Sequence, residues 1–289
     1  MKRIFKGFLA AAVLIFCFGA GTVTGSGSGR KESGNGGTVP ETRETTAETV
    51  PETRETEGEI RKPGKESRET GKESRETGEE MKETEQAFYS TEITDELMER
   101  MQGKSWKDNC TLSREDLRYL HLLHRDPEGE IREGEMVCNV HIAETLLTIF
   151  RELFKAGYPI EKIRLVDEYD AVDELSMQDN NSSCFNFRFV SYTTRVSKHG
   201  LGLAVDINPL YNPYVKKVSG RLSIEPAAGA PYVDRSGEFP FKIDENDLCY
   251  RIFLAHGFEW GGSWKNSKDY QHFEVPTEII RTWYPDYGS

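Results

Sequence analysis

A long polar tract restricts where this 289-residue chain can fold. Between residues 26 and 87 there is no aromatic residue, and Glu, Thr, Arg, Lys, Ser and Gly dominate the composition. Short units recur within the tract, at Val39–Thr45 and Val50–Thr56, and again at Gly64–Thr70 and Gly71–Thr77. Such segments bury too little apolar surface to offset the entropy of ordering, and these repeats are too short and polar to stack as a solenoid. We therefore expect a disordered linker over residues 26–90, whose simplest role is a solvated spacer. A place between membrane and cell wall would suit such a spacer, and a specific binding role is the alternative.

The first residues have the pattern of an export signal. A basic start (Met1–Lys6) is followed by an apolar run from Phe8 to Phe18 and then by small residues, which is typical of a secretory leader. The apolar run is shorter than the about 20 residues that span a bilayer, although an uncleaved anchor extending to Val23 is the alternative. We expect residues 1–25 to be a signal peptide or an N-terminal membrane anchor. The protein would then be exported to the extracellular space, to the cell wall or to the outer face of the membrane.

Residues 91–289 form a single domain of ordinary size, large enough to bury a core. The formal net charge of the chain is −12, and most of this excess lies in that domain. So acidic a domain disfavours binding to nucleic acid, which is itself strongly negative. We expect no nucleic-acid partner, and we expect the domain to act as a monomer.

The sequence does not determine whether or how the cysteines form disulfides. The domain contains Cys110, Cys138, Cys184 and Cys249. An even number permits disulfides in an exported chain, and four cysteines allow three pairings, among which the sequence does not choose. Because no two of them have a Cys-x-x-Cys spacing, a cysteine zinc site is not expected.

Local patterns predict both helices and strands in the domain. Thr94 is a suitable cap for a short helix over Thr91–Met101, and apolar residues at three- and four-residue spacing predict a longer helix over residues 142–156. Ser113 and Asp116 form a capping-box pattern that predicts a further helix, with Leu117, Leu120 and Leu123 on its buried side. The other expected elements are strands at 134–139, 160–166 and 203–207, a helix at 247–255, and loops at 167–179 and 210–240.

Two short runs carry residues suited to metal chemistry, namely Ser197–Pro209 and Asp269–Glu274. In the first run, His199 and Asp206 lie seven residues apart with two glycines between them, and the strand over 203–207 turns Asp206 away from its apolar face. The second run adds His272. Two histidines and one aspartate make a plausible three-ligand set for Zn²⁺, with a fourth position left for water. Asp269, three residues before His272, remains available as a general base.

Arg188 and two tryptophans have two interpretations each. Arg188 lies in an aromatic-rich stretch, expected as a strand, just ahead of the first run. Its guanidinium would balance an oxyanion or hold a substrate carboxylate, or it would simply pair with an acidic side chain of the loop at 167–179. Trp260 and Trp264 suit either a cleft wall or the core, with Trp264 favoured for the cleft.

These motifs, taken together and in this order, resemble one known family. The motifs are Asn180–Arg188, Ser197-x-His199-x-x-Gly202-x-Ala204-x-Asp206-Ile-Asn-Pro209, Trp260-Gly-Gly-x-Trp264 and Asp269-x-x-His272-Phe. They are similar to the D-alanyl-D-alanine carboxypeptidase and L-alanyl-D-glutamate endopeptidase family of zinc peptidases, and the similarity runs through most of residues 91–289. The resemblance implies an α+β fold with a central antiparallel sheet and flanking helices, of the type shared with hedgehog signalling domains.

The resemblance also implies a site and a substrate class. It implies zinc on His199, Asp206 and His272, with Asp269 as the base. Arg188 would stabilise the scissile carbonyl oxygen, and Ser197 would contact the substrate, which is a peptidoglycan stem peptide.

The resemblance does not determine which bond of the stem peptide is cut. Asp rather than Glu at the base position is more like the endopeptidase branch, but this difference is small. Two rival functions remain. One is a catalytically silent wall-binding module on the same fold, and the other is a zinc amidase that cuts between sugar and peptide.

Overall fold

The computed structural model describes residues 84–190 and 193–288. These residues lie in one compact unit, Pro63–Ser289, whereas the predicted leader and nearly all of the predicted linker lie outside the described residues. The fold starts earlier than residue 91, because Phe88 is only 4% exposed. In addition, β1 (Tyr89–Glu92) pairs with a strand of the first sheet. The last residues assigned to the linker therefore belong to the folded domain.

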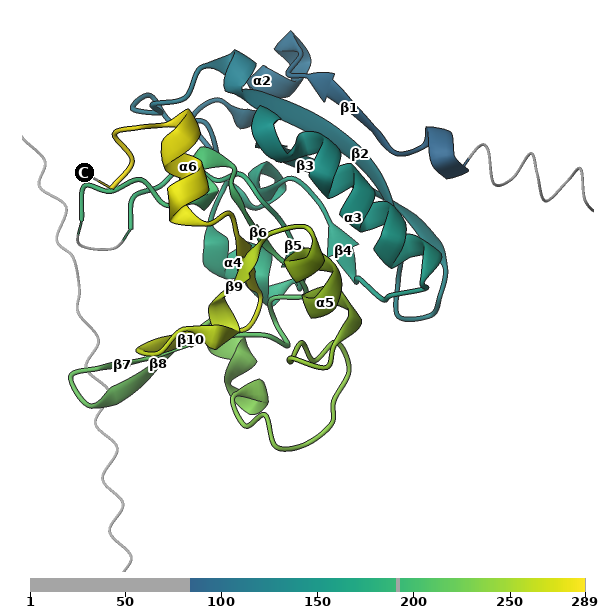
Figure 1. The fold of residues 1–289 in the computed structure, drawn as a ribbon, viewed down its shortest axis with the longest axis vertical. Helices are drawn as coiled ribbons and strands as arrows, with labels where there is room; N and C mark the ends of the chain where they lie inside the picture. The colour runs from purple at the N-terminus through teal and green to yellow at the C-terminus, as the bar shows by residue number, and fades with distance from the viewer. Residues whose placement is uncertain (1–83, 191–192, 289) are drawn as a thin grey trace, which may run out of the picture. The chain divides into compact units, whose positions relative to one another are not determined.

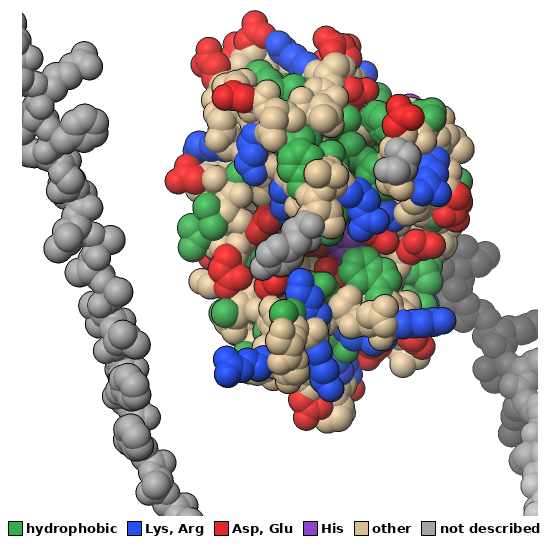
Figure 2. Space-filling view, turned by 90° about the vertical axis from the view of Figure 1, so that its left-hand side faces the viewer, with side chains coloured by type: hydrophobic (Ala, Val, Ile, Leu, Met, Phe, Trp, Pro, Cys, Tyr) green, Lys and Arg blue, Asp and Glu red, His purple; other side chains and the backbone are tan. Residues whose placement is uncertain are grey.

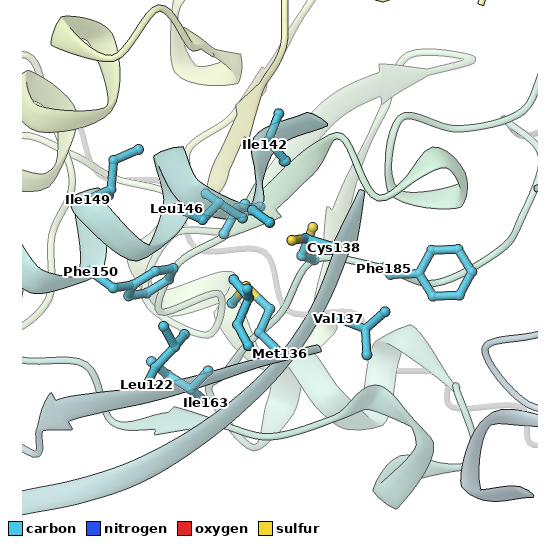
Figure 3. Packing of buried hydrophobic residues seen from close by; sticks show 14 of the residues in the cluster. Leu122, Met136, Val137, Cys138, Ile142, Leu146, Ile149, Phe150, Ile163 and Phe185 are labelled. Carbon is cyan, nitrogen blue, oxygen red and sulfur yellow. The ribbon is translucent and has the colours of Figure 1, made fainter. Parts of the chain in front are cut away.

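A large part of the hydrophobic core lies between the first sheet and the longest described helix. The strands are β1, β2 (Leu117–Arg125) and β3 (Ile131–Asn139), antiparallel and in that order, and α3 (Ala143–Lys155) lies along their face (Figure 1). Leu146 and Phe150 of α3 face Met136 and Leu122 of the sheet (Figure 3). All four side chains are at most 2% exposed, so this sandwich of helix and sheet is a well-buried support for the rest of the domain.

Two smaller antiparallel sheets carry the residues of interest. One has the order β6-β11-β9, and the other has the order β10-β7-β8. Their strands are β6 (Ala204–Asp206), β7 (Tyr214–Val218), β8 (Arg221–Glu225), β9 (Glu259–Trp260), β10 (Ser267–Asp269) and β11 (His272–Glu274). The hairpin β7–β8 projects from the rest of the described chain (Figure 1).

The remaining elements are short. They are the helices α2 (Asp95–Met101), α4 (Asp173–Gln178), α5 (Leu248–Ala255) and α6 (Thr277–Trp283), and the parallel pair β4 (Lys162–Ile163) and β5 (Asn181–Ser182). The mixture of helices and antiparallel sheets is an α+β architecture. The antiparallel strands that the described residues form are divided among three three-stranded sheets rather than gathered in one central sheet.

Several local predictions are confirmed. Thr94 caps α2 through a hydrogen bond from the Leu97 amide at 3.2 Å. The long helix and the strand before it are present as α3 and β3. The helix expected at 247–255 is present as α5, and Asp247 caps it by accepting hydrogen bonds from the amides of the first turn.

The helix predicted after Ser113 is wrong. The capping box is present, but it closes only a 3₁₀ turn (Arg114–Asp116), after which the chain extends into β2. Pairing with strands on both sides outweighs the helical spacing of Leu117, Leu120 and Leu123, and all three are buried as strand residues.

The predicted loops contain regular structure, and predicted strands are shorter or absent. The segment 167–179 contains α4, and 210–240 contains the hairpin β7–β8. Ser219 and Gly220 join the hairpin with φ of 49° and 80°, as in a tight two-residue turn. Only Lys162 and Ile163 of the strand at 160–166 pair in a sheet. The stretch around Arg188 has no strand, only the bridge Phe189–Val196.

The cysteines in the described part of the chain are all free thiols, and three of the four are buried. Of the described helices, none is both long enough and apolar enough to cross a bilayer.

Candidate metal centre and active site

The pairing of β6 with β11 brings two of the expected ligands together. The antiparallel register sets His272 directly opposite Asp206, so both side chains leave the same face of the sheet. His199 comes from the 3₁₀ turn (His199–Leu201) that leads into β6. Gly202 ends this turn with φ 66°, and a Cβ there would lie 2.7 Å from the Asn139 amide nitrogen. Glycine is therefore required at residue 202 for the chain to turn against β3 and present His199 to the sheet.

Three possible ligand atoms meet at one point. His199 Nε2 lies 3.0 Å from His272 Nδ1 and 3.3 Å from Asp206 Oδ2. His272 Nδ1 lies 3.0 Å from Asp206 Oδ1. In a tetrahedral zinc site with bonds near 2.0 Å, neighbouring ligand atoms are about 3.3 Å apart. All three residues are buried, and the spacing of their donor atoms fits one small cation.

The outer nitrogens of both histidines are already engaged. His199 Nδ1 lies 2.8 Å from the Cys184 carbonyl oxygen, which can only accept, so Nδ1 carries the proton. His272 Nε2 lies 3.0 Å from Glu274 Oε2, and an ionised carboxylate likewise requires a proton on Nε2. Each ring then directs its other nitrogen toward Asp206, which is how metal-binding histidines are held in proteins. One nitrogen lone pair of each histidine and the Asp206 carboxylate therefore converge in a buried space, and donor sets of this kind bind cations.

The electrostatics show how the same site behaves without a cation. Burial alone would lower the pKa of His272, but its hydrogen bonds to Asp206 and Glu274 raise that pKa to about 10. Burial would raise the pKa of Asp206, yet the charges and hydrogen bonds of His199 and His272 hold it well below its usual value. A proton on His272 Nδ1 thus places a positive charge next to the Asp206 carboxylate.

Asp269 is a second, different carboxylate beside the ligands. It is the last residue of β10, and it lines the same cavity as the three ligands. Its Oδ1 is buried and has no hydrogen-bond partner among the described residues. Burial raises the pKa of Asp269 to about 8. Gly261 makes its position possible, because a Cβ on that glycine would lie 2.8 Å from the Asp269 Cβ. An unpaired buried carboxylate oxygen in a cavity is typical of a group that exchanges protons with a ligand or water.

Arg188 pairs with the acidic segment at 167–179 and also lines the cavity. Its Nε is 3.0 Å from Asp173 Oδ2, so it does pair with the acidic segment before it. It also lines the cavity, with its side chain about one-third exposed (32%), and its charge acts to lower the pKa of Asp269. Ser197 lines the cavity as well, and its amide donates to the Arg188 carbonyl oxygen at 2.9 Å.

The cavity that these residues share is open and about 640 Å³ in volume. Figure 2 shows histidine surface inside a hollow, with acidic side chains next to it. Trp264 lies in its wall, with its ring centre 5.4 Å from that of His272. Trp260 is buried and donates its indole N–H to the Tyr270 carbonyl oxygen at 2.9 Å, so it belongs to the core.

Sequence reasoning missed several residues of the cavity wall. Tyr214, Lys216 and Glu225 come from the unpredicted hairpin, while Lys198 and Glu274 stand next to predicted site residues. The alternation His272-Phe-Glu274 is a usable signal, because residues two apart in a strand share a face. The hairpin residues have no such signal, since their place depends on the pairing of β7 with β10.

Comparison with known proteins supports the resemblance over part of the chain. The family model described as D-alanyl-D-alanine carboxypeptidase matches residues 191–275. The match includes Ser197, the three possible ligands and Asp269, but it begins after Arg188 and covers less of the chain than the motifs suggested. Neither a curated protein nor a solved structure matches the chain. Residues 191–275 are thus similar to the D-alanyl-D-alanine carboxypeptidases, a family of zinc peptidases.

Proposed function

We propose that this protein is a zinc-dependent hydrolase of peptidoglycan stem peptides, either a D-alanyl-D-alanine carboxypeptidase or an L-alanyl-D-glutamate endopeptidase. The family match supports a peptidase of this type. The observation that carries the proposal is the convergence of His199 Nε2, His272 Nδ1 and the Asp206 carboxylate within one buried space. This donor set suits zinc better than Mg²⁺ or Ca²⁺, which prefer oxygen ligands.

The residues around the ligands have distinct roles in this proposal. Zinc, when bound to His199, Asp206 and His272, supplies the charge that activates water and polarises a carbonyl. Asp269 accepts the proton of the attacking water at Oδ1 and returns it to the leaving amine. Arg188 stabilises the negative charge that develops on the carbonyl oxygen.

The rest of the chain fits a cell-wall enzyme. We propose that residues 1–25 direct export or anchor the protein, and that the polar tract over residues 26–90 spaces the domain from the membrane. Ser197, half-buried in the cavity wall, is proposed to contact the stem peptide, and the domain is proposed to act as a monomer.

A direct assay tests the proposal. The purified protein, loaded with zinc, is incubated with the pentapeptide L-Ala-D-Glu-(diamino acid)-D-Ala-D-Ala and with intact peptidoglycan, with and without a chelator. Products are identified by mass spectrometry. Loss of one terminal alanine identifies a carboxypeptidase, and release of L-alanine identifies an endopeptidase. Absence of cleavage despite bound zinc would contradict the proposal and favour a silent wall-binding module.

A further inference from the structure

A largely buried ion pair connects the two segments that carry the proposed ligands. Lys198, which directly precedes His199, places its Nζ 3.1 Å from Glu274 Oε1. The two side chains are only 10% and 12% exposed. The same Nζ also donates to the Val275 carbonyl oxygen at 2.7 Å. Lys198 therefore joins the turn before β6 to the end of β11.

The other oxygen of Glu274 reaches the ring of His272. Oε2 lies 3.0 Å from His272 Nε2, which is the nitrogen on the far side of the ring from Asp206. The strand geometry allows this contact, because His272 and Glu274 are two residues apart on one face of β11, while Phe273 faces the core with no exposed surface. Glu274 is thus held by Lys198 at one oxygen and by His272 at the other.

We infer that Glu274 is a positioning residue that fixes the proton of His272 on Nε2 and directs Nδ1 toward His199 and Asp206, and that Lys198 holds Glu274 in place for this role. The inference rests on the metal site of the proposed function. It also distinguishes the carboxylates of the cavity. Both oxygens of Glu274 are engaged, whereas Asp269 Oδ1 has no partner among the described residues, so Asp269 is the one available to move protons.

The burial of this pair supports a role in the site. A buried ion pair costs desolvation of both charges, and apolar side chains of similar volume are often as stabilising. Partners of this kind outside the ligands hold the ring and raise its basicity, and their loss typically weakens metal binding about 10- to 100-fold. The Lys198–Glu274 pair lies next to the proposed ligands in both of its segments, which is the placement that this function requires.

Zinc affinity of the whole protein, measured by competition with a chromogenic chelator, tests the inference. Glu274→Ala is expected to weaken zinc binding about 10- to 100-fold. Glu274→Gln keeps an oxygen that accepts from Nε2–H, so its loss is expected to be smaller. Lys198→Met is expected to weaken binding in the wild-type background but to add nothing to Glu274→Ala, because Lys198 acts through Glu274.

A matched control separates this effect from the loss of any buried lysine. Lys242 is 9% exposed and pairs with Asp244 at 3.2 Å, away from the cavity. Lys242→Met is expected to leave zinc affinity unchanged. An equal loss of affinity in Lys242→Met and Lys198→Met would overturn the role of Lys198.

Nitrogen-15 NMR of the histidine rings reads the proton position itself. In the zinc-loaded wild type, His272 is expected to keep a slowly exchanging proton on Nε2, and Glu274→Ala is expected to lose that protection. Unchanged affinity and an unchanged ring spectrum in Glu274→Ala would overturn the inference. A wild-type protein that binds no zinc would instead overturn the metal site, and this positioning role with it.

Discussion

Asp269 and Glu274 are carboxylates on either side of His272 in sequence, and their surroundings differ. Glu274 is paired at both oxygens, while the buried Oδ1 of Asp269 has no hydrogen-bond partner in the described structure. The residue types alone do not separate them, because either acid is an acceptable base at this distance from a ligand. Their hydrogen bonds do, and they favour Asp269 over Glu274 as the proposed base.

Replacing Asp269 therefore separates chemistry from binding. Asp269→Ala is expected to retain one zinc ion and to lose about 10²- to 10⁴-fold in kcat, as when a general base is removed. Zinc content by mass spectrometry and peptide turnover measure the two effects. Asp244→Asn, away from the cavity, serves as the control, and full activity in Asp269→Ala would refute its role as base.

Replacing His199, unlike replacing Asp269, is expected to remove the metal as well as the activity. His199→Ala removes one of three donors from a buried set, so both zinc content and activity should be lost. Chelation of the wild type should reproduce the loss of activity, and added zinc should restore it in the wild type only. A variant that keeps stoichiometric zinc at the wild-type affinity would count against the ligand assignment.

The two interpretations of Arg188 are tested by comparing it with its partner. If Arg188 stabilises the oxyanion, Arg188→Gln should lower kcat/KM by about 10²-fold or more. Asp173→Asn only removes the 3.0 Å salt bridge, so a loss below tenfold is expected. Equal losses in the two variants would assign Arg188 to the salt bridge alone.

At the scale of elements, the position of the ligands depends on how β11 is packed. Phe273, between His272 and Glu274, stacks on Phe253 of α5 with ring centres 4.3 Å apart and planes 15° apart. Both rings have no exposed surface. This contact fixes one face of β11 and so directs the other face, with both polar side chains, into the cavity.

Truncation of that contact should be costly. Phe253→Ala is expected to lower the free energy of unfolding by about 3–5 kcal/mol, because it leaves a cavity in the core. Urea denaturation followed by tryptophan fluorescence measures the change. Leu254 in the same helix is 37% exposed, so Leu254→Ala should change the stability far less, and similar losses in both variants would contradict this packing argument.

The elements also show what the sequence could predict. Thr94 was found correctly as a helix cap, and the helix expected at 247–255 begins at the Asp247 cap, because both starts depend on hydrogen bonds within one turn. The spacing of His199, Asp206, Asp269 and His272 likewise indicated the residues that line one cavity. The strand at Leu117 and the hairpin at Tyr214 were missed, because their structure depends on partners far along the chain. Glu274 was missed as a functional residue, since its role depends on contacts with His272 and Lys198.

For the whole molecule, the buried charges make stability depend on pH and on metal. His272 has its pKa raised from 6.5 to about 10, so the folded, metal-free protein holds a proton that the unfolded chain releases above pH 6.5. The stabilisation is therefore complete below pH 6.5 and is lost as the pH rises toward 10. The pKa of Asp269 is raised from 3.8 to about 8, so its bound proton also stabilises the folded form, and this contribution is lost as the pH rises from 3.8 toward 8. The metal-free protein should lose stability steadily between pH 6.5 and 10.

Bound zinc should offset this loss of stability at high pH. Binding requires that His272 Nδ1 release its proton, so the rise in Tm caused by saturating zinc should be larger at pH 9 than at pH 6.5. Scanning calorimetry at both pH values, with zinc and with chelator, measures the two trends. A zinc-dependent rise that shrinks with pH would contradict the assignment of Nδ1 as a ligand atom.

The proposed base and two of the three proposed ligands, Asp206 and His272, belong to different sheets. Asp269 pairs with Tyr214 in the sheet of the projecting hairpin. His272, three residues after Asp269, pairs with Asp206 in the sheet β6-β11-β9. A displacement of the hairpin would carry Asp269 with it and leave the three donor atoms in place. A preparation of this protein can therefore be fully metallated and still contain inactive molecules, so the concentration of working enzyme has to be titrated with a ligand that reports on Asp269 rather than deduced from its zinc content.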